Sequence, residues 1–361
     1  MKYNNPAATF TNTLQSSLNA LKGLLIIFVV MDHNDLLRIL APDLFRPLTF
    51  HVLGFLVLPF LLPTKPVDRG FFRDRLIRYL VPFWWVLTFT TLMYALAFRN
   101  GGGLSTVAVD WLAAAAIGSA PLVKTATGFY YLWFLPCLAG MVILLTLFQS
   151  LNKSWQYASG IVMLLGHAVI TAFPEVLLRY TPFGLLIVMW VFPLGLLMRW
   201  AITNGWVFRL RYLILVVFLA SYSYLVAIGL NVEIMTLELR SISEPLLFLL
   251  QDITAVSGVL MVMWIATKLD KLSMLNLCGK HSLMVYLLHP LVFFLGYKLS
   301  GVSNLHLESY PLLAVGVLSV VLTVSISLLL AIGIARIPIA RAWLTPKDWK
   351  DWGPVRLLSR A

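Results

Sequence analysis

Apolar runs of about 17 to 25 residues, the length that crosses a membrane as a helix, recur along the whole chain between short polar segments. Each run has the length and the scarcity of charge that are typical of a transmembrane helix. We expect ten such helices, over residues 18–38, 48–62, 75–98, 130–149, 156–173, 182–199, 209–229, 245–267, 282–299 and 310–335. The pattern therefore predicts an all-α, polytopic integral membrane protein with ten transmembrane helices.

One further apolar stretch, residues 104–120, is short and contains Asp110. We interpret it as an interfacial or re-entrant piece rather than as an eleventh span. The basic residues support this choice, because an eleventh span would move every later cluster of lysines and arginines to the other side of the membrane. With ten spans, both termini lie on the same side.

Composition and charge agree with a membrane protein. The chain is 60% hydrophobic and 12% charged, whereas a soluble domain carries about 25% charged residues. The net charge of +12 would suit nucleic acid, but with a cytoplasmic N-terminus twenty of the 27 lysines and arginines lie on the inner side and seven on the outer side. This positive-inside bias predicts a protein of the cell inner membrane with both termini in the cytoplasm and no nucleic-acid partner.

The cysteines and the N-terminus exclude two other classes. Cys137 and Cys278 fall in segments that we place toward opposite sides of the membrane, so we expect neither a disulfide nor a metal framework. A polar segment leads into the first helix without a small-residue cleavage site, so we expect no cleavable signal peptide.

The first stretch with candidate chemistry is LNALKGLLIIFVVMDH, residues 18–33. Lys22 and His33 are eleven residues apart, which on a helix is three turns plus ~20°, with ~16 Å of rise. The two side chains therefore share one helical face. An imidazole within a membrane span is either a functional residue or one that only hydrogen-bonds to a neighbouring helix, and this stretch alone leaves both open.

The second stretch is FFRDRLIRYLVPFWW, residues 71–85. Arg75 and Arg78 are three residues apart and share a face at the inner end of the third helix, with Arg73 on the same approach. They are either a positive-inside anchor or a grip for phosphate, whose oxygens match the guanidinium fork.

These stretches belong to a longer series of short patterns that run in order from residue 18 to 290. After Lys22, His33, Arg75 and Arg78 the series continues with a Trp-Phe-Leu and with a Gly-x-x-Ser that is followed by Tyr and His-Pro. Its remaining members are Phe50-His51, Pro82, Phe83, Trp84, Trp133, Phe134, Leu135, Gly279, Ser282, Tyr286, His289 and Pro290. In this series the chain resembles the acyltransferase 3 family, the integral-membrane acyltransferases that O-acylate glycans and lipids.

The resemblance implies an architecture and an activity. Residues 1–335 would form the ten-helix acyltransferase 3-like domain, and residues 336–361 a basic tail, with three tryptophans, that lies along the inner interface. The protein would be an acyl-CoA-dependent O-acyltransferase that modifies a cell-envelope or exported polysaccharide or a lipid-linked glycan. Because acetyl is the acyl group most often implied by the family, it would be an O-acetyltransferase. Acetyl-CoA would be its donor substrate, and no permanently bound cofactor is expected.

The resemblance also implies roles for individual residues. His33 would be the general base for the acceptor hydroxyl, a task that suits an imidazole, whose ordinary pKa is about 6.5. Asp32 would orient it, although consecutive helical residues point ~100° apart. Lys22, Arg75 and Arg78 would bind the donor phosphates. Further residues would contact the acceptor or support the site, or else only hydrogen-bond within the core; they are His51, Trp133, Ser282, Tyr286 and His289.

The chain departs from the family pattern at two places. Lys22 stands where the family usually has arginine, so a planar two-pronged contact is lost while the charge is kept. The second helix lacks the usual Ser-Gly ending and runs into Leu58-Pro59, which leaves a role for that helix open.

Two other classes of protein fit the helix pattern. A multi-span exporter of a glycan or small solute would also have many helices and intramembrane histidines, but no inverted repeat relates residues 1–180 to 181–361. A purely structural subunit leaves the Lys22–His33 register unexplained.

Overall fold

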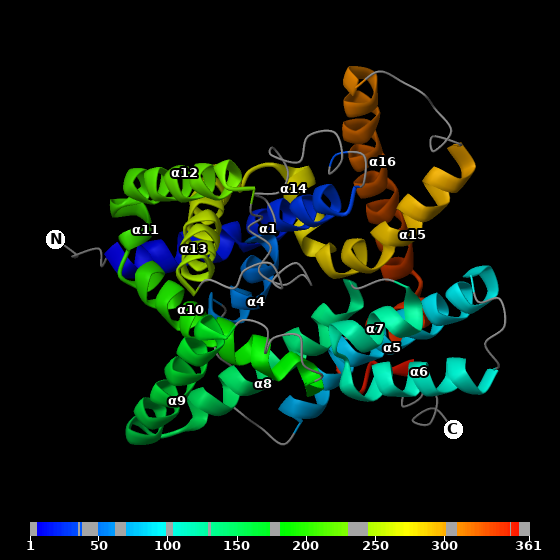
Figure 1. Cartoon of the computed structure of the whole chain (residues 1–361), viewed down its shortest axis with the longest axis horizontal. Helices are drawn as coiled ribbons and strands as arrows, with labels where there is room; N and C mark the ends of the chain where they lie inside the picture. Colours follow the sequence, from blue (N-terminus) through cyan, green and yellow to red (C-terminus); the bar gives the residue numbers. More distant parts are fainter. Residues whose placement is uncertain are drawn as a thin grey trace. The chain divides into compact units, whose positions relative to one another are not determined.

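The computed structural model of the 361-residue chain describes residues 6–34, 37, 50–61, 70–98, 104–128, 131–173, 181–229, 245–300, 309–346 and 348–353. Over these residues its regular structure is entirely helical (Figure 1). The α-helices are α1 (Pro6–Asp32), α4 (His51–Leu61), α5 (Phe71–Phe98), α6 (Leu104–Ile117), α7 (Ala120–Thr127), α8 (Phe134–Ser150), α9 (Lys153–Ala172), α10 (Leu185–Thr203), α11 (Trp206–Arg209), α12 (Arg211–Ala227), α13 (Pro245–Lys268), α14 (Ser273–Lys280), α15 (Ser282–Ser300), α16 (Ser309–Arg336) and α17 (Pro338–Leu344). Short 3₁₀ turns precede α8 (Tyr131–Trp133) and α10 (Pro182–Gly184).

The helices agree with a polytopic membrane protein. Five apolar helical segments within the described residues are long enough to cross a membrane, namely Phe71–Leu96, Tyr131–Ser150, Pro182–Thr203, Pro245–Lys268 and Leu313–Arg336. The pair α14 and α15, bent by 85° at His281, would add a sixth. Shorter apolar helices include α4, α6 and α12. The chain is thus an all-α, multi-pass membrane protein.

The first predicted helix is wrong at both ends. It was expected over residues 18–38, but α1 begins at Pro6 and ends at Asp32. The end has a local cause at Asn34, whose side-chain oxygen accepts a hydrogen bond of 3.1 Å from the backbone N–H of Leu37. Asparagine competes with the helix for backbone donors in this way. His33 is therefore the first residue beyond α1, although its backbone N–H still donates to the carbonyl of Val29.

The described structure divides into two compact units. The first unit comprises residues 1–58 and 194–333, and the second comprises 59–193 and 334–361. In the first unit α1 packs most extensively against α14 and α13 and also contacts α15, while α12 lies along α13 (Figure 1).

Glycines allow α1 and α14 to approach closely. A Cβ on Gly279 of α14 would overlap the backbone carbonyl of Asn19, and a Cβ on Gly23 of α1 would overlap that of Leu275. The glycine of the Gly-x-x-Ser pattern is therefore a packing residue, which brings the segment that leads into α15 against the part of α1 that carries Lys22.

In the second unit, α6 and α7 form a helical hairpin along α5 (Figure 1). The indole of Trp84 donates to the carbonyl of Ala115 at 3.0 Å, and the indole of Trp111 donates to Thr88 Oγ1 at 3.0 Å. These two pairs show that α6 runs antiparallel to α5. Gly118, at φ +68°, turns the chain into α7.

The hairpin returns toward the end of α5 from which it came, because Gly128, directly after α7, packs against the ring of Tyr94. At 14 residues, α6 is ~21 Å long, and it packs in this hairpin against α5. The interpretation of residues 104–120 as an interfacial or re-entrant piece stays a prediction.

Candidate active site

The imidazoles of His33 and His289 meet inside the first unit. Their ring centroids are 5.1 Å apart, and the ring planes are inclined by 70° in an edge-to-face arrangement. His33 lies at the end of α1 and His289 in the middle of α15, and these two helices are in contact. Two histidines 256 positions apart in the chain are therefore direct neighbours.

Each ring is held by the backbone of its own helix. His33 Nδ1 lies 2.8 Å from the carbonyl oxygen of Val29, and His289 Nδ1 lies 3.2 Å from that of Val285. Because a carbonyl only accepts hydrogen bonds, Nδ1 carries the proton in each neutral ring. This tautomer leaves the lone pair on Nε2, which is the nitrogen that can accept a proton.

The His-Pro pattern of α15 has a structural reason. Pro290 has no N–H, so the carbonyl of Tyr286 four residues earlier receives no helical hydrogen bond from it. The imidazole of His289 interacts with that carbonyl as well as with Val285. The ring thus compensates for the break in the helix, and the proline helps to fix the ring.

His289 is enclosed while His33 is accessible. The side chain of His289 is fully buried, with the rings of Tyr286 and Phe293 at 6.0 and 6.3 Å. His51, the first residue of α4, is also buried and interacts electrostatically with His289. His33 is only half-buried, so of the three imidazoles it is the most exposed.

Asn34 belongs to this site and was missed by the sequence reasoning. Its amide nitrogen donates to the carbonyl of Gly316 at 3.1 Å and to Ser319 Oγ at 2.6 Å, both in α16. The fully buried amide therefore ties the residue after His33 to another helix. The available signal was an asparagine placed directly after Asp-His at the end of an apolar run.

The predicted orienting residue, Asp32, is not joined to the imidazole. Asp32 is half-buried as the last residue of α1, and no hydrogen bond or ion pair connects it to His33, whose Nδ1 is bound to Val29 instead. Of the other predicted residues on α15, Ser282 begins the helix and is half-buried, whereas Tyr286 lies against the His289 ring.

The remaining predicted residues fall in separate places. Lys22 is half-buried on α1, in the first unit. Arg75 and Arg78 lie on the first turns of α5 in the second unit; Arg75 is half-buried with its guanidinium 5.2 Å from the ring centroid of Phe71, and Arg78 is exposed. Trp133, buried before α8, also belongs to the second unit.

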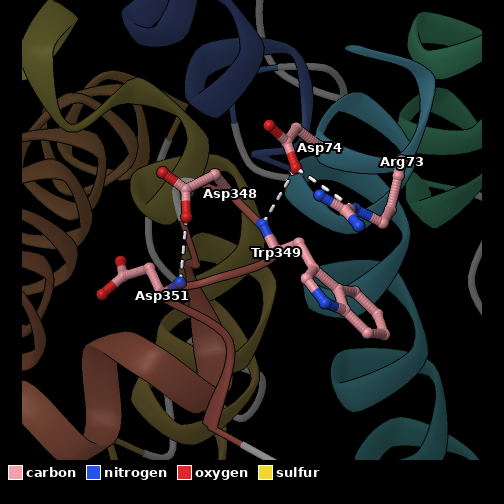
Figure 2. A network of polar contacts seen from close by, with 5 residues as sticks. All are labelled: Arg73, Asp74, Asp348, Trp349 and Asp351. Atoms are coloured by element: carbon pink, nitrogen blue, oxygen red, sulfur yellow. Dashed lines mark hydrogen bonds and ion pairs between the residues drawn. The ribbon is translucent and has the colours of Figure 1, made fainter. Parts of the chain in front are cut away.

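Arg73 contacts the C-terminal segment although its side chain is exposed (Figure 2). Its guanidinium lies 5.2 Å from a ring centroid of Trp349, and its Nε lies 3.7 Å from Asp74 Oδ1. The same oxygen of Asp74 accepts a hydrogen bond from the backbone N–H of Trp349 at 3.1 Å, and Asp348 accepts one from the N–H of Asp351 at 2.9 Å. Part of the tryptophan-rich tail thus packs on the first turn of α5.

No group of three or more metal-ligand side chains is spaced to hold a metal ion in the described ranges. The two cysteines are free and buried.

The comparisons with known proteins identify the family. The model of the acyltransferase 3 family, described as an acyltransferase domain, matches residues 15–332, which include most of α1, the helices from α4 to α15 and most of α16. No curated protein and no solved structure matches the chain. The matched range takes in both members of the imidazole pair and the arginines of α5. The chain belongs to the acyltransferase 3 family and is a multi-pass membrane acyltransferase.

Proposed function

We propose that the protein transfers an acyl group from cytoplasmic acyl-CoA to a hydroxyl of a cell-envelope polysaccharide or lipid-linked glycan. Acetyl is the first candidate for this acyl group. His33 is the general base. The observation that carries this proposal is the hydrogen bond from His33 Nδ1 to the carbonyl of Val29, because it leaves Nε2 of a half-exposed imidazole as the proton acceptor.

The reaction needs one proton to be moved twice. Nε2 of His33 takes the proton of the acceptor hydroxyl as its oxygen attacks the carbonyl carbon of the thioester. The carbon–sulfur bond then breaks, and the proton on His33 passes to the departing CoA thiolate. The products are an ester on the glycan and free CoA, and the histidine returns to its initial state.

The donor phosphates bind to Lys22, Arg75 and Arg78 in this proposal. Charge-assisted bonds from guanidinium and ammonium groups to phosphate are the strong ones. The ~16 Å rise between Lys22 and His33 matches an extended pantetheine arm.

We further propose ten membrane spans with both termini in the cytoplasm, in the cell inner membrane. The ten spans would be the five long apolar segments named above, α1, the bent pair α14–α15, the 20-residue α9, and the shorter apolar helices α4 and α12. The glycan approaches from the outer side in this proposal, with Trp133 and His51 as candidate residues near it and with Ser282 and Tyr286 as candidate supporting residues on α15.

The test is acyl transfer by the purified protein in liposomes supplied with acetyl-CoA and an envelope glycan. The proposal predicts new acyl esters on the glycan by mass spectrometry, and none with the His33→Ala protein. Transport of unmodified glycan without ester formation would instead identify an exporter.

A further inference from the structure

We propose that His289 is the positioning partner of His33, holding its ring in place and stabilising the imidazolium that forms during acyl transfer. The inference rests on the proposed role of His33 as general base. It assigns to a buried histidine of α15 the part that a carboxylate commonly plays beside a catalytic histidine.

A general base of this kind needs a partner, because the ring must keep one orientation and must carry a positive charge in the transition state. Asp32 is adjacent in the chain, but no contact joins it to the imidazole. The ring that His33 does meet is that of His289, at 5.1 Å between centroids. The edge-to-face geometry is the favourable one for two aromatic rings, since the positive edge of one faces the negative face of the other.

The contacts of His289 hold its ring in one orientation. Its side chain is completely buried, its Nδ1 is bound to the carbonyl of Val285, and its ring also interacts with the carbonyl of Tyr286, to which Pro290 cannot donate. These contacts all lie within α15. A ring fixed in this way limits the orientations open to the more exposed His33.

The tautomer of His289 favours support of a charge. With the proton on Nδ1, the Nε2 lone pair lies on the edge of the ring that points away from the α15 backbone. A lone pair and an aromatic face both attract a cation. When His33 takes the proton of the acceptor hydroxyl, its charge therefore develops beside a neutral, electron-rich ring. Because like charges at this separation repel, the pair is expected to carry at most one positive charge at a time.

Three substitutions separate this role from a structural one. His289→Asn keeps a donor near the Nδ1 position, so it preserves the bond to the α15 backbone and loses the far edge of the ring. His289→Gln reaches the Nε2 position and loses the Nδ1 donor. His289→Phe keeps the ring and loses both nitrogens. A positioning partner predicts that Asn and Phe lower kcat on the order of 10- to 100-fold, part of the 10²- to 10⁴-fold effect of losing the base itself, and that Gln retains more activity than Asn.

A matched control comes from the second unit. His167 on α9 makes the same kind of bond, with its Nδ1 2.7 Å from the carbonyl of Trp190, and its ring is half-buried. His167→Asn is expected to leave kcat unchanged. The Kd for acetyl-CoA should be unchanged in every His289 variant, because the proposed phosphate grip uses the charges of Lys22, Arg75 and Arg78 and not this ring.

The decisive measurement is kcat for acyl transfer by each reconstituted variant, with and without His33→Ala. If His289 acts through His33, His289→Asn costs nothing further in the His33→Ala background. Wild-type kcat in a folded His289→Asn protein would overturn the inference while leaving the proposed function intact. Full activity of His33→Ala would overturn the proposed function instead. Should the Phe variant fail to fold, the ranking of Gln against Asn decides the question.

Discussion

The side-chain amide of Asn34 donates a hydrogen bond of 2.6 Å to Ser319 Oγ, across 285 positions of the chain. This bond fastens the residue after His33 to α16, while the imidazole itself rests on α1 and α15. The proposed base therefore stands where three helices are tied together by polar contacts.

Removing this tie is expected to affect stability and turnover together. Asn34→Ala leaves the carbonyl of Gly316 and the N–H of Leu37 without their side-chain partner, and an unsatisfied buried group costs about 1–3 kcal/mol. We expect a lower thermal midpoint in detergent and a lower kcat with unchanged acyl-CoA affinity. Ser319→Ala is the milder control, because Asn34 keeps its bond to Gly316. Equal stability of Asn34→Ala and the wild type would contradict this role.

The close crossing of α1 and α14 predicts an unusual sensitivity to a single methyl group. Gly279→Ala places a Cβ against the carbonyl of Asn19, and overpacking of this kind costs about 1–3 kcal/mol. Gly160→Ala on α9 is the matched control, since nothing lies within 4 Å of its Cβ position and alanine favours a helix by up to ~1 kcal/mol. Thermal unfolding should rank Gly279→Ala below the wild type and Gly160→Ala at or above it. The reverse ranking would refute the packing argument.

The proposed donor site predicts a loss of acyl-CoA affinity. Arg75→Ala and Arg78→Ala should each weaken binding by the ~1.5–3 kcal/mol of a charge-assisted contact, or roughly 10- to 150-fold in Kd. Lys22→Arg should bind better than Lys22→Ala. The control is Arg209→Ala, in another basic segment. Unchanged Kd in all the alanine variants of the proposed grip would leave these cations as membrane anchors only.

Much of the helix pattern could be predicted from the sequence, because lipid demands long apolar runs at every span. The C-terminal end of α1 could not, since it depends on an asparagine that bonds to α16. Nor could the close glycine crossing of α14 over α1, which lies next to the bend at His281. Such long-range contacts leave no trace in local hydrophobicity.

The candidate site could be predicted only in part. His33 stands out in an apolar helix, and Pro290 marks His289, but the edge-to-face pairing of the two rings joins segments that no spacing relates. Asp32 is a candidate from the sequence only because carboxylates commonly orient histidines. The carbonyl of Val29 takes that position at Nδ1 instead, and a backbone acceptor has no signature in the sequence.

The ten-span proposal makes a prediction of its own. Single cysteines at Asn100 and Thr345 should react with a membrane-impermeant thiol reagent from opposite sides, Asn100 from outside and Thr345 from the cytoplasm. The positive-inside distribution of lysines and arginines is the reason. A variant without Cys137 and Cys278 is the background control. Labelling of both positions from one side would rule out ten spans.

The most direct test of the account is acyl transfer by His33→Gln in liposomes with acetyl-CoA. Glutamine keeps a hydrogen-bonding side chain but cannot take up a proton, so kcat should fall by roughly 10²- to 10⁴-fold while the Kd for acetyl-CoA and the thermal midpoint stay at wild-type values. Near-normal acyl transfer by the stably folded His33→Gln protein would contradict the assignment of His33 as the general base.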